Sequence, residues 1–204
     1  MVVTDTAKAM ATPEGQARNE EIFQAAAELM VQRGYAGTSM GDLAKAVGMT
    51  KAGLYHHISS KQDMLFQILL HAMEGLERTV IEPAKRITDP EERLREMIRL
   101  HVRGLFDHGL EFAFLFPEKR HLEPAQQQVV GQQIESYLGL IRETLRELAD
   151  EGKLQDLDIY IAARHILQTI AGIARWHKAD TGVTEALLVE QTVNFNMSAI
   201  LKNS

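Results

Sequence analysis

Histidines and carboxylates are the side chains of this sequence that could carry acid–base or metal chemistry. Beyond residue 100 the candidates for an enzyme are His101, His108, His121, His165, Glu111, Glu118 and Glu123. None of them stands at the spacing of a catalytic triad or a metal site. His121 and Glu123 point about 200° apart on a helix, and adjacent His56 and His57 about 100° apart. A helical enzyme is therefore the weakest alternative, and we expect no metal and no cofactor.

A second group of residues suits the binding of an apolar molecule. Aromatic and sulfur-containing side chains accumulate beyond residue 70, with imidazole and amide groups among them. An apolar pocket with a few orienting polar groups has this composition. The candidate pocket residues are Met73, Met97, His101, Phe106, Phe112, Phe116, Tyr137, His165, Gln168 and Trp176. For each of them singly, ordinary packing in a core is the alternative.

A third group, Thr38–Lys61, has the pattern of two short helices joined by a glycine turn, a helix-turn-helix. Ser39 and Thr50 can cap the helices over 40–47 and 51–57, and Gly48 can make the turn. A small core between them would consist of Leu43, Ala44, Val47 and Leu54. The residues left to face a DNA groove are Thr50, Lys51, Ala52, Gly53, Tyr55 and His56.

The elements that must position these groups are all predicted to be helical. Apolar residues recur at helical spacing, N-cap residues and glycines separate the stretches, and no run of β-branched residues alternates. The sequence therefore predicts an all-α fold. Besides the pair above, helices are predicted over 14–33, from Ser59 or Ser60 through Val80 until Pro83 ends it, from Asp89-Pro90 through Leu105, irregularly over 110–117, from about Pro124 to Gly152, from Ile159 to about Lys178, and over 184–201.

The residues around the helix-turn-helix also match a pattern at fixed offsets. They are Ile22, Ala25, Ala26, Gly34, Tyr35, Thr38, Asp42, Leu43, Ala44, Val47, Gly48, Leu54, Tyr55, Lys61 and Leu65. This pattern resembles the TetR family of transcriptional regulators. The resemblance implies a flexible arm over 1–13, a three-helix helix-turn-helix DNA-binding domain over 14–60, and a larger helical ligand-binding and dimerisation domain over 61–204. It also implies that the protein regulates transcription, and that it does so as a repressor, as is expected for this family.

The same resemblance implies roles for individual residues by their position. The residues expected to touch phosphates or sugars are Thr38, Ser39, Tyr55, His56 and Lys61. Such contacts position a protein on DNA without reading its sequence. The residues expected at base edges are Thr50, Lys51, Ala52 and Gly53. Lys51 could donate to guanine N7 or O6, while Ala52 and Gly53 are small enough to let the backbone come close.

Charge and composition limit the remaining possibilities. The 204 residues carry a net charge of −6, and residues 1–65 hold six basic against seven acidic side chains. Any DNA binding must therefore depend on a few specifically positioned contacts rather than on a large excess of positive charge. The absence of cysteine excludes a disulfide framework and a thiolate metal site. Neither a signal peptide nor an apolar run of roughly 20 residues is visible, so we expect a cytoplasmic protein with no membrane partner.

The C-terminal domain is expected to pair two copies of the chain and to sense a small molecule. One helix-turn-helix presents little surface, so a homodimer joined by the last two helices should read a palindromic operator. Residues 172–182 resemble the TetR branch that senses acyl-CoA thioesters, although His177 and the missing proline before Gly182 depart from it. This implies release of operator DNA by an acyl-CoA or another apolar carboxylate. The alternatives are a constitutive DNA-binding protein without effector, and last helices that are only monomer core.

Overall fold

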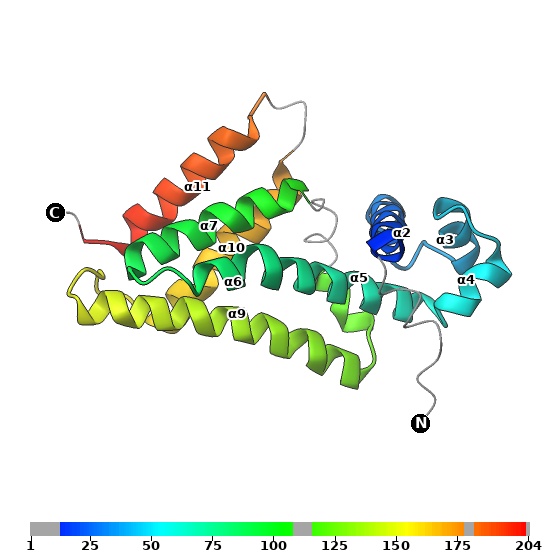
Figure 1. Ribbon diagram of the computed structural model, residues 1–204, viewed down its shortest axis with the longest axis horizontal. Coiled ribbons are helices and arrows are strands. Elements are labelled where there is room, and N and C mark those ends of the chain that lie inside the picture. Colours follow the sequence, from blue (N-terminus) through cyan, green and yellow to red (C-terminus); the bar gives the residue numbers. More distant parts are fainter. Residues whose placement is uncertain (1–12, 108–115, 178–181, 203–204) are drawn as a thin grey trace.

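The computed structural model describes residues 13–107, 116–177 and 182–202, and this part of the chain is helical apart from loops and one isolated bridge between Leu154 and Leu201. The prediction of an all-α fold is confirmed (Figure 1). Phe112, His108, Glu111 and nearly all of the predicted arm and of the irregular helix at 110–117 lie outside the described residues. In chain order the elements are α2 (Pro13–Arg33), α3 (Met40–Ala46), α4 (Lys51–His57), α5 (Lys61–Leu76), the π-helical η1 (Glu77–Ile81), α6 (Glu82–Ala84), α7 (Pro90–Asp107), the 3₁₀ helix η2 (Phe116–His121), α9 (Pro124–Asp150), α10 (Ile159–Trp176) and α11 (Glu185–Ile200).

The N-terminal helices α2, α3 and α4 gather at one end of the molecule, beside the first half of α5 (Figure 1). α2 ends where Gly34 adopts a φ of +73°, a left-handed conformation that side chains other than glycine rarely tolerate. Gly48 does the same between α3 and α4, with a φ of +67°. Leu43, Ala44 and Leu54 are buried as the sequence predicts. This small core fixes the angle between the two short helices.

α5 leads from the N-terminal helices into the rest of the molecule, and it continues past its predicted stop. The helix widens into the π turn η1 and then runs through Pro83 to Ala84. Proline has no backbone N–H to donate. Pro83 falls in the first turn of α6, where a backbone donor is not required. The wide turn thus lets the helix pass a residue that would otherwise break it.

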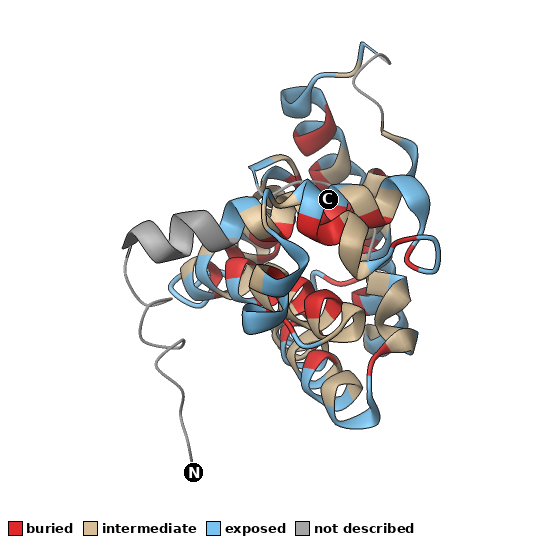
Figure 2. Cartoon of the chain, turned by 90° about the vertical axis from the view of Figure 1, so that its right-hand side faces the viewer, coloured by how far each residue is buried: buried red, intermediate tan, exposed pale blue. Residues whose placement is uncertain are grey.

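The remaining helices form a bundle. α7 begins with the predicted cap, because the backbone N–H of Glu92 donates to Asp89 Oδ1 at 2.8 Å. α7 packs against α9 and α11, and α10 lies against α9. Only one side of α10 is buried: Ile166 and Ile170 face the core, while Tyr160 and Ile161 are each 53% exposed. Figure 2 shows buried residues on the inner faces of the helices.

The buried apolar residues form two clusters rather than one. One cluster lies within the C-terminal bundle, and the other joins the N-terminal helices to Leu65 and Ile68 of α5. Leu122 and Val130, which come from the C-terminal half of the sequence, belong to the N-terminal cluster. Ile134 packs against both. The division into domains at residue 60 stays a prediction.

Candidate DNA-binding surface and ligand site

The start of α3 is fixed by a reciprocal pair of side chain and backbone bonds. The N–H of Asp42 donates to Ser39 Oγ at 3.2 Å, and the N–H of Ser39 donates to Asp42 Oδ2 at 3.1 Å. Arg33 lies 3.2 Å from the other carboxylate oxygen of Asp42. The bonds from Ser39, and more weakly the charge of Arg33, hold the pKa of Asp42 below its ordinary value. This capping box keeps the exposed Ser39 in place at the N-terminus of α3.

α4 presents its first turn and one side to solvent. Thr50 caps the helix, because the N–H of Gly53 donates to Thr50 Oγ1 at 3.0 Å. Thr50, Lys51 and Ala52 are exposed, and Gly53 is half-buried. A Cβ at position 53 would lie 3.1 Å from Thr50 Oγ1, so glycine lets this turn close tightly. Further along, Tyr55 is 47% exposed, and His56 is exposed as well.

Thr38 and Lys61, two residues expected to contact the DNA backbone, are engaged within the protein. Thr38 is 2% exposed, and its hydroxyl donates to the carbonyl oxygen of Gly34 at 2.9 Å. Lys61 Nζ donates to the carbonyl oxygen of Tyr35 at 2.8 Å. Both therefore brace the turn after α2 in this structure, while Ser39, Thr50, Lys51, Ala52, Tyr55 and His56 lie open on the surface.

A polar pair lies inside the C-terminal bundle. His101 Nδ1 of α7 and the hydroxyl of Tyr137 of α9 share a hydrogen bond of 3.2 Å, and Tyr137 is 1% exposed. Desolvation lowers the pKa of His101 to about 4 and raises the pKa of Tyr137 above its ordinary value. Both groups are therefore neutral at pH 7. Met97, one turn before His101, is fully buried.

The structure places the predicted pocket residues in several parts of the molecule. Met97 and Tyr137 are buried in the bundle, half-buried His101 is hydrogen-bonded to Tyr137, and Met73 is buried on α5. Phe106 is half-buried with its ring edge on His177, at 5.3 Å between centroids. Phe116 is half-buried at the N-terminal cluster. The three on α10, His165, Gln168 and Trp176, are exposed.

The exposed side of α10 forms a groove with α11. His165 and Gln168 line it together with apolar residues that include Ile161 and Phe195. Trp176 is 54% exposed near the end of α10. These residues are not brought together with His101 and Tyr137, so their place in a common pocket stays a prediction.

Among the described residues, three further buried side-chain polar atoms have no hydrogen-bond partner: Gln133 Oε1, Arg142 Nη1 and His177 Nδ1. Sequence reasoning missed Gln133. It stands four residues before Tyr137 and so on the same face of α9, which is the signal that would have found it. Buried polar atoms lacking partners are costly in a closed core and are satisfied when a polar ligand group arrives. Among the described residues, no three His, Asp or Glu side chains lie together as metal ligands would.

A helix-turn-helix with an exposed and capped second helix, carried by a separate helical bundle, defines a DNA-binding transcriptional regulator. Residues 22–68 match the family described as bacterial regulatory proteins, tetR family, and residues 88–200 match the tetracyclin repressor-like C-terminal domain. The chain belongs to the TetR family of transcriptional regulators. It is a regulator and not an enzyme. No helix in the described ranges is long and apolar enough to cross a membrane.

Relatives within the family include regulators named for both directions of control. The chain is 24% identical over 192 residues to the HTH-type transcriptional repressor KstR2 of Rhodococcus jostii, covering 90% of this chain and 91% of that one. It is 24% identical over 178 residues to the transcriptional activator FasR of Mycolicibacterium smegmatis, covering 87% and 80%. Among solved structures, AibR in complex with isovaleryl coenzyme A and operator DNA superposes with a TM-score of 0.80 at 29% identity, covering 87% and 97%.

Proposed function

We propose that this protein is a ligand-responsive repressor that binds a palindromic operator as a homodimer and releases it when a small apolar effector enters the C-terminal bundle. The observation that carries the proposal is the exposed first turn of α4, where Thr50, Lys51 and Ala52 lie beside a tight glycine turn. We assign base contacts to Thr50, Lys51, Ala52 and Gly53, and backbone contacts to Ser39, Tyr55 and His56. Thr38 and Lys61, bonded within the protein, would support the turn after α2. A protein acting on chromosomal DNA would work in the cytoplasm.

The dimer is proposed to form through α10 and α11. Tyr160, Ile161 and Trp176 expose more than half of their surface on α10, and Phe195 is 67% exposed on α11. Of these, Ile161 and Phe195 line the groove between α10 and α11, and exposed apolar patches of this kind are characteristic of interfaces between proteins. Two copies joined there would bury them and would hold two α4 helices at the separation of two half-sites.

The effector is proposed to be an acyl-CoA or another apolar carboxylate. The described part of the bundle holds the neutral His101–Tyr137 pair and three buried polar atoms without a partner, Gln133 Oε1, Arg142 Nη1 and His177 Nδ1. The uncharged pair suits a carbonyl or thioester group, and the guanidinium of Arg142 suits a carboxylate. The similarity to AibR, which binds isovaleryl coenzyme A and operator DNA, supports the same class of effector.

Release of DNA follows from linkage between the two sites. The effector must bind better to a conformation in which the two α4 helices no longer match successive major grooves. α5 joins the N-terminal helices to the bundle and would transmit the conformational change from the effector site to the α4 helices. Equal affinity of the effector for free and operator-bound protein would contradict this mechanism.

The first experiment is selection of bound DNA from a random pool with the full chain. We expect a palindrome whose half-sites lie one helical turn or a multiple of it apart, about 10 base pairs per turn. Enrichment of a single unpaired half-site would remove the dimer from the proposal. No enrichment would remove sequence-specific DNA binding.

The second experiment measures thermal unfolding and operator binding with a panel of acyl-CoAs that includes isovaleryl-CoA, with free CoA as control. An effector should raise the unfolding temperature and weaken operator binding. If the selected operator binds but no acyl-CoA has either effect, the constitutive alternative without effector is favoured.

A further inference from the structure

The η2 helix and the start of α9 lie against α5, and the end of η2 also contacts the turn that follows α2. We refer to residues 13–57, which contain α2, α3, α4 and the turns between them, as the DNA module. Leu122, which follows η2, is 4% exposed and Val130 of α9 is fully buried, and both pack in the same cluster as Tyr35 of the DNA module. The bundle therefore contributes side chains to the core of the DNA module, in addition to the covalent connection through α5.

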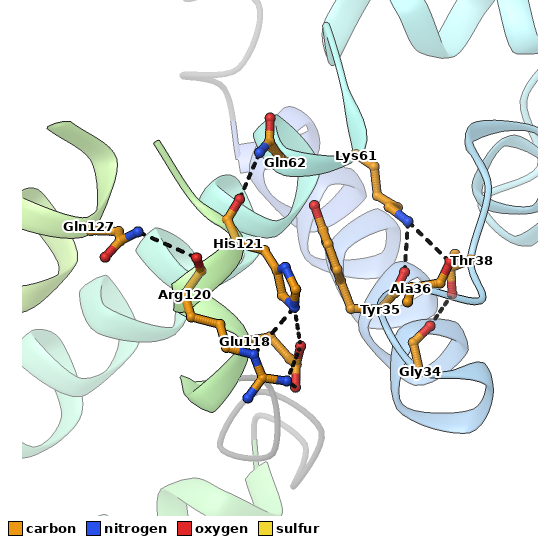
Figure 3. Close-up of polar contacts among 10 residues, drawn as sticks. All are labelled: Gly34, Tyr35, Ala36, Thr38, Lys61, Gln62, Glu118, Arg120, His121 and Gln127. Atoms are coloured by element: carbon orange, nitrogen blue, oxygen red, sulfur yellow. Dashed lines mark hydrogen bonds and ion pairs between the residues drawn. The ribbon is translucent and has the colours of Figure 1, made fainter. Parts of the chain in front are cut away.

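The centre of this junction is a stacked pair of rings. Tyr35 lies in the turn after α2, and its ring stacks on the imidazole of His121 at 4.6 Å between centroids and 19° between planes. Figure 3 shows the two side chains facing each other, with Lys61 reaching the turn that carries Tyr35. Lys61 Nζ lies 4.5 Å from the centroid of the Tyr35 ring and donates to the Tyr35 carbonyl oxygen. Tyr35 is thus held by α5 and by η2 together.

His121 is itself fixed by side chain and backbone bonds. Its Nε2 lies 3.1 Å from Glu118 Oε2, and Arg120 reaches the same carboxylate at 3.0 Å. Gln62 of α5 donates to the His121 carbonyl oxygen at 2.7 Å, and Gln127 of α9 donates to that of Leu122 at 2.9 Å. The two backbone bonds tie the end of η2 to α5 and α9, and the imidazole itself would lose its contact with Glu118 if it turned away from Tyr35 (Figure 3).

A single helical connection leaves a module free to bend and rotate about it, especially where the helix contains a π turn such as η1. A second contact away from the helix axis removes that freedom. The Tyr35–His121 stack joins residues 86 positions apart in sequence, on two elements that α5 alone would not hold in register. Burial and the nearby Glu118 charge raise the pKa of Tyr35, so its phenol stays neutral.

We infer that Tyr35 and His121 are positioning residues that set the orientation of the DNA module on the bundle, and through it the spacing of the two α4 helices in a dimer. The importance of that spacing for operator binding rests on the proposed function. The role of the two residues in setting the orientation of the DNA module does not depend on the proposed function. The two parts can therefore be tested separately.

The orientation is tested by distance measurement between spin labels. Because the chain has no cysteine, Lys45→Cys on α3 and Arg146→Cys on α9, both exposed, give unique attachment sites. Labelled chains are mixed with excess unlabelled protein, so that distances within one chain dominate. We expect one narrow distance distribution in the parent protein and in His121→Phe, which keeps an aromatic ring. His121→Ala should give a broad or shifted distribution, and Gln132→Ala, at an exposed residue of α9, should change nothing.

A distribution in His121→Ala that equals the parent would overturn the inference, provided that circular dichroism shows the helices intact. If His121→Ala fails to fold, Glu118→Gln and Gln62→Ala, which loosen the support of His121, replace it with the same readout. None of these measurements needs DNA or an effector, so the result stands even if the proposed operator or effector is wrong.

The functional part uses the operator found by selection. If loss of the stack reduces the population of the binding-competent orientation to about a tenth, operator affinity falls about tenfold. The base preference should be unchanged, because neither ring lies on the proposed base-reading surface. Altered base preference would make His121 part of the reading surface, and unchanged affinity with a broadened distance distribution would show that operator binding does not depend on this orientation.

Discussion

The DNA module and the C-terminal bundle carry their polar chemistry in opposite ways. In the DNA module, hydroxyls, an ammonium and small residues lie on the outside, fixed by short-range bonds such as the Ser39–Asp42 box. In the bundle, His101 and Tyr137 lie inside, fixed by packing between α7 and α9. The first arrangement reads a large rigid partner by surface contact, and the second suits a small molecule that must be enclosed. A regulator needs both, and also a junction that lets one affect the other.

The largest effect is expected from removing the apolar support under the exposed surface. Leu54 is 1% exposed between α3 and α4, and Leu54→Ala should cost about 2 to 5 kcal/mol of unfolding free energy. Chemical denaturation measures the loss, and operator binding should weaken with it. The exposed Val129→Ala is the control and should stay within about 0.5 kcal/mol. A loss as small as that of the control would mean that the DNA module does not depend on this core.

The interior pair should make the bundle sensitive to acid. His101 has a pKa of about 4 in the folded protein and about 6.5 when unfolded. Between these values the unfolded state binds more protons, so stability falls as the pH drops from 6.5 towards 4 and levels off below it. The contribution is at most about 3 kcal/mol.

The measurement for the interior pair is urea denaturation at several pH values, in the parent and in His101→Gln. Glutamine can still bond to Tyr137 but does not titrate. The difference in stability between the two proteins should therefore shift in favour of the glutamine variant as the pH falls. A pH-independent difference would show that His101 does not keep a depressed pKa.

We expect base recognition to depend on Lys51 more than on any other side chain of α4. Lys51→Ala should reduce discrimination at one base position per half-site by about 1 to 3 kcal/mol. Binding to operators altered at each position measures it. An equal loss on every sequence would instead assign Lys51 to phosphate, and Lys45→Ala on α3 serves as the matched control.

The smallest effect is expected at the helix cap. Ser39→Ala removes the acceptor for the Asp42 N–H and should cost about 1 kcal/mol, whereas Ser39→Thr should retain most of it. Thermal unfolding of the three proteins gives the comparison. Because Ser39 is also a proposed phosphate contact, a drop in operator affinity larger than the drop in stability would separate the two roles.

The two regions also differ in how much of their structure could be predicted from the sequence. The helix-turn-helix depends on neighbours three or four residues apart, so its caps and glycine turns were predictable, as was the burial of Leu43, Ala44 and Leu54, whereas Val47 is half-buried. The placement of Thr38 was not: its inward hydroxyl depends on how the chain turns after Gly34. The continuation of α5 through Pro83 was missed because a π turn carries no clear local signal.

The bundle interior depends on contacts across many residues, and prediction was accordingly weaker. Composition indicates residue types that suit an apolar pocket, but it does not say which side of α10 faces inward, so the prediction groups His165, Gln168 and Trp176 with His101 and Tyr137. Gln133 and the Tyr35–His121 stack depend on which helices become neighbours. Helical periodicity alone does not contain that information.

The commitment of Lys61 to Tyr35 has a consequence for behaviour in salt. With its ammonium bonded inside the protein, the exposed lysines of α3 and α4 are Lys45 and Lys51. Each phosphate neutralised by a lysine releases condensed counterions and adds about −0.9 to the slope of log affinity against log salt concentration. Few such contacts mean a shallow slope, so operator occupancy should resist changes in ionic strength and respond mainly to geometry.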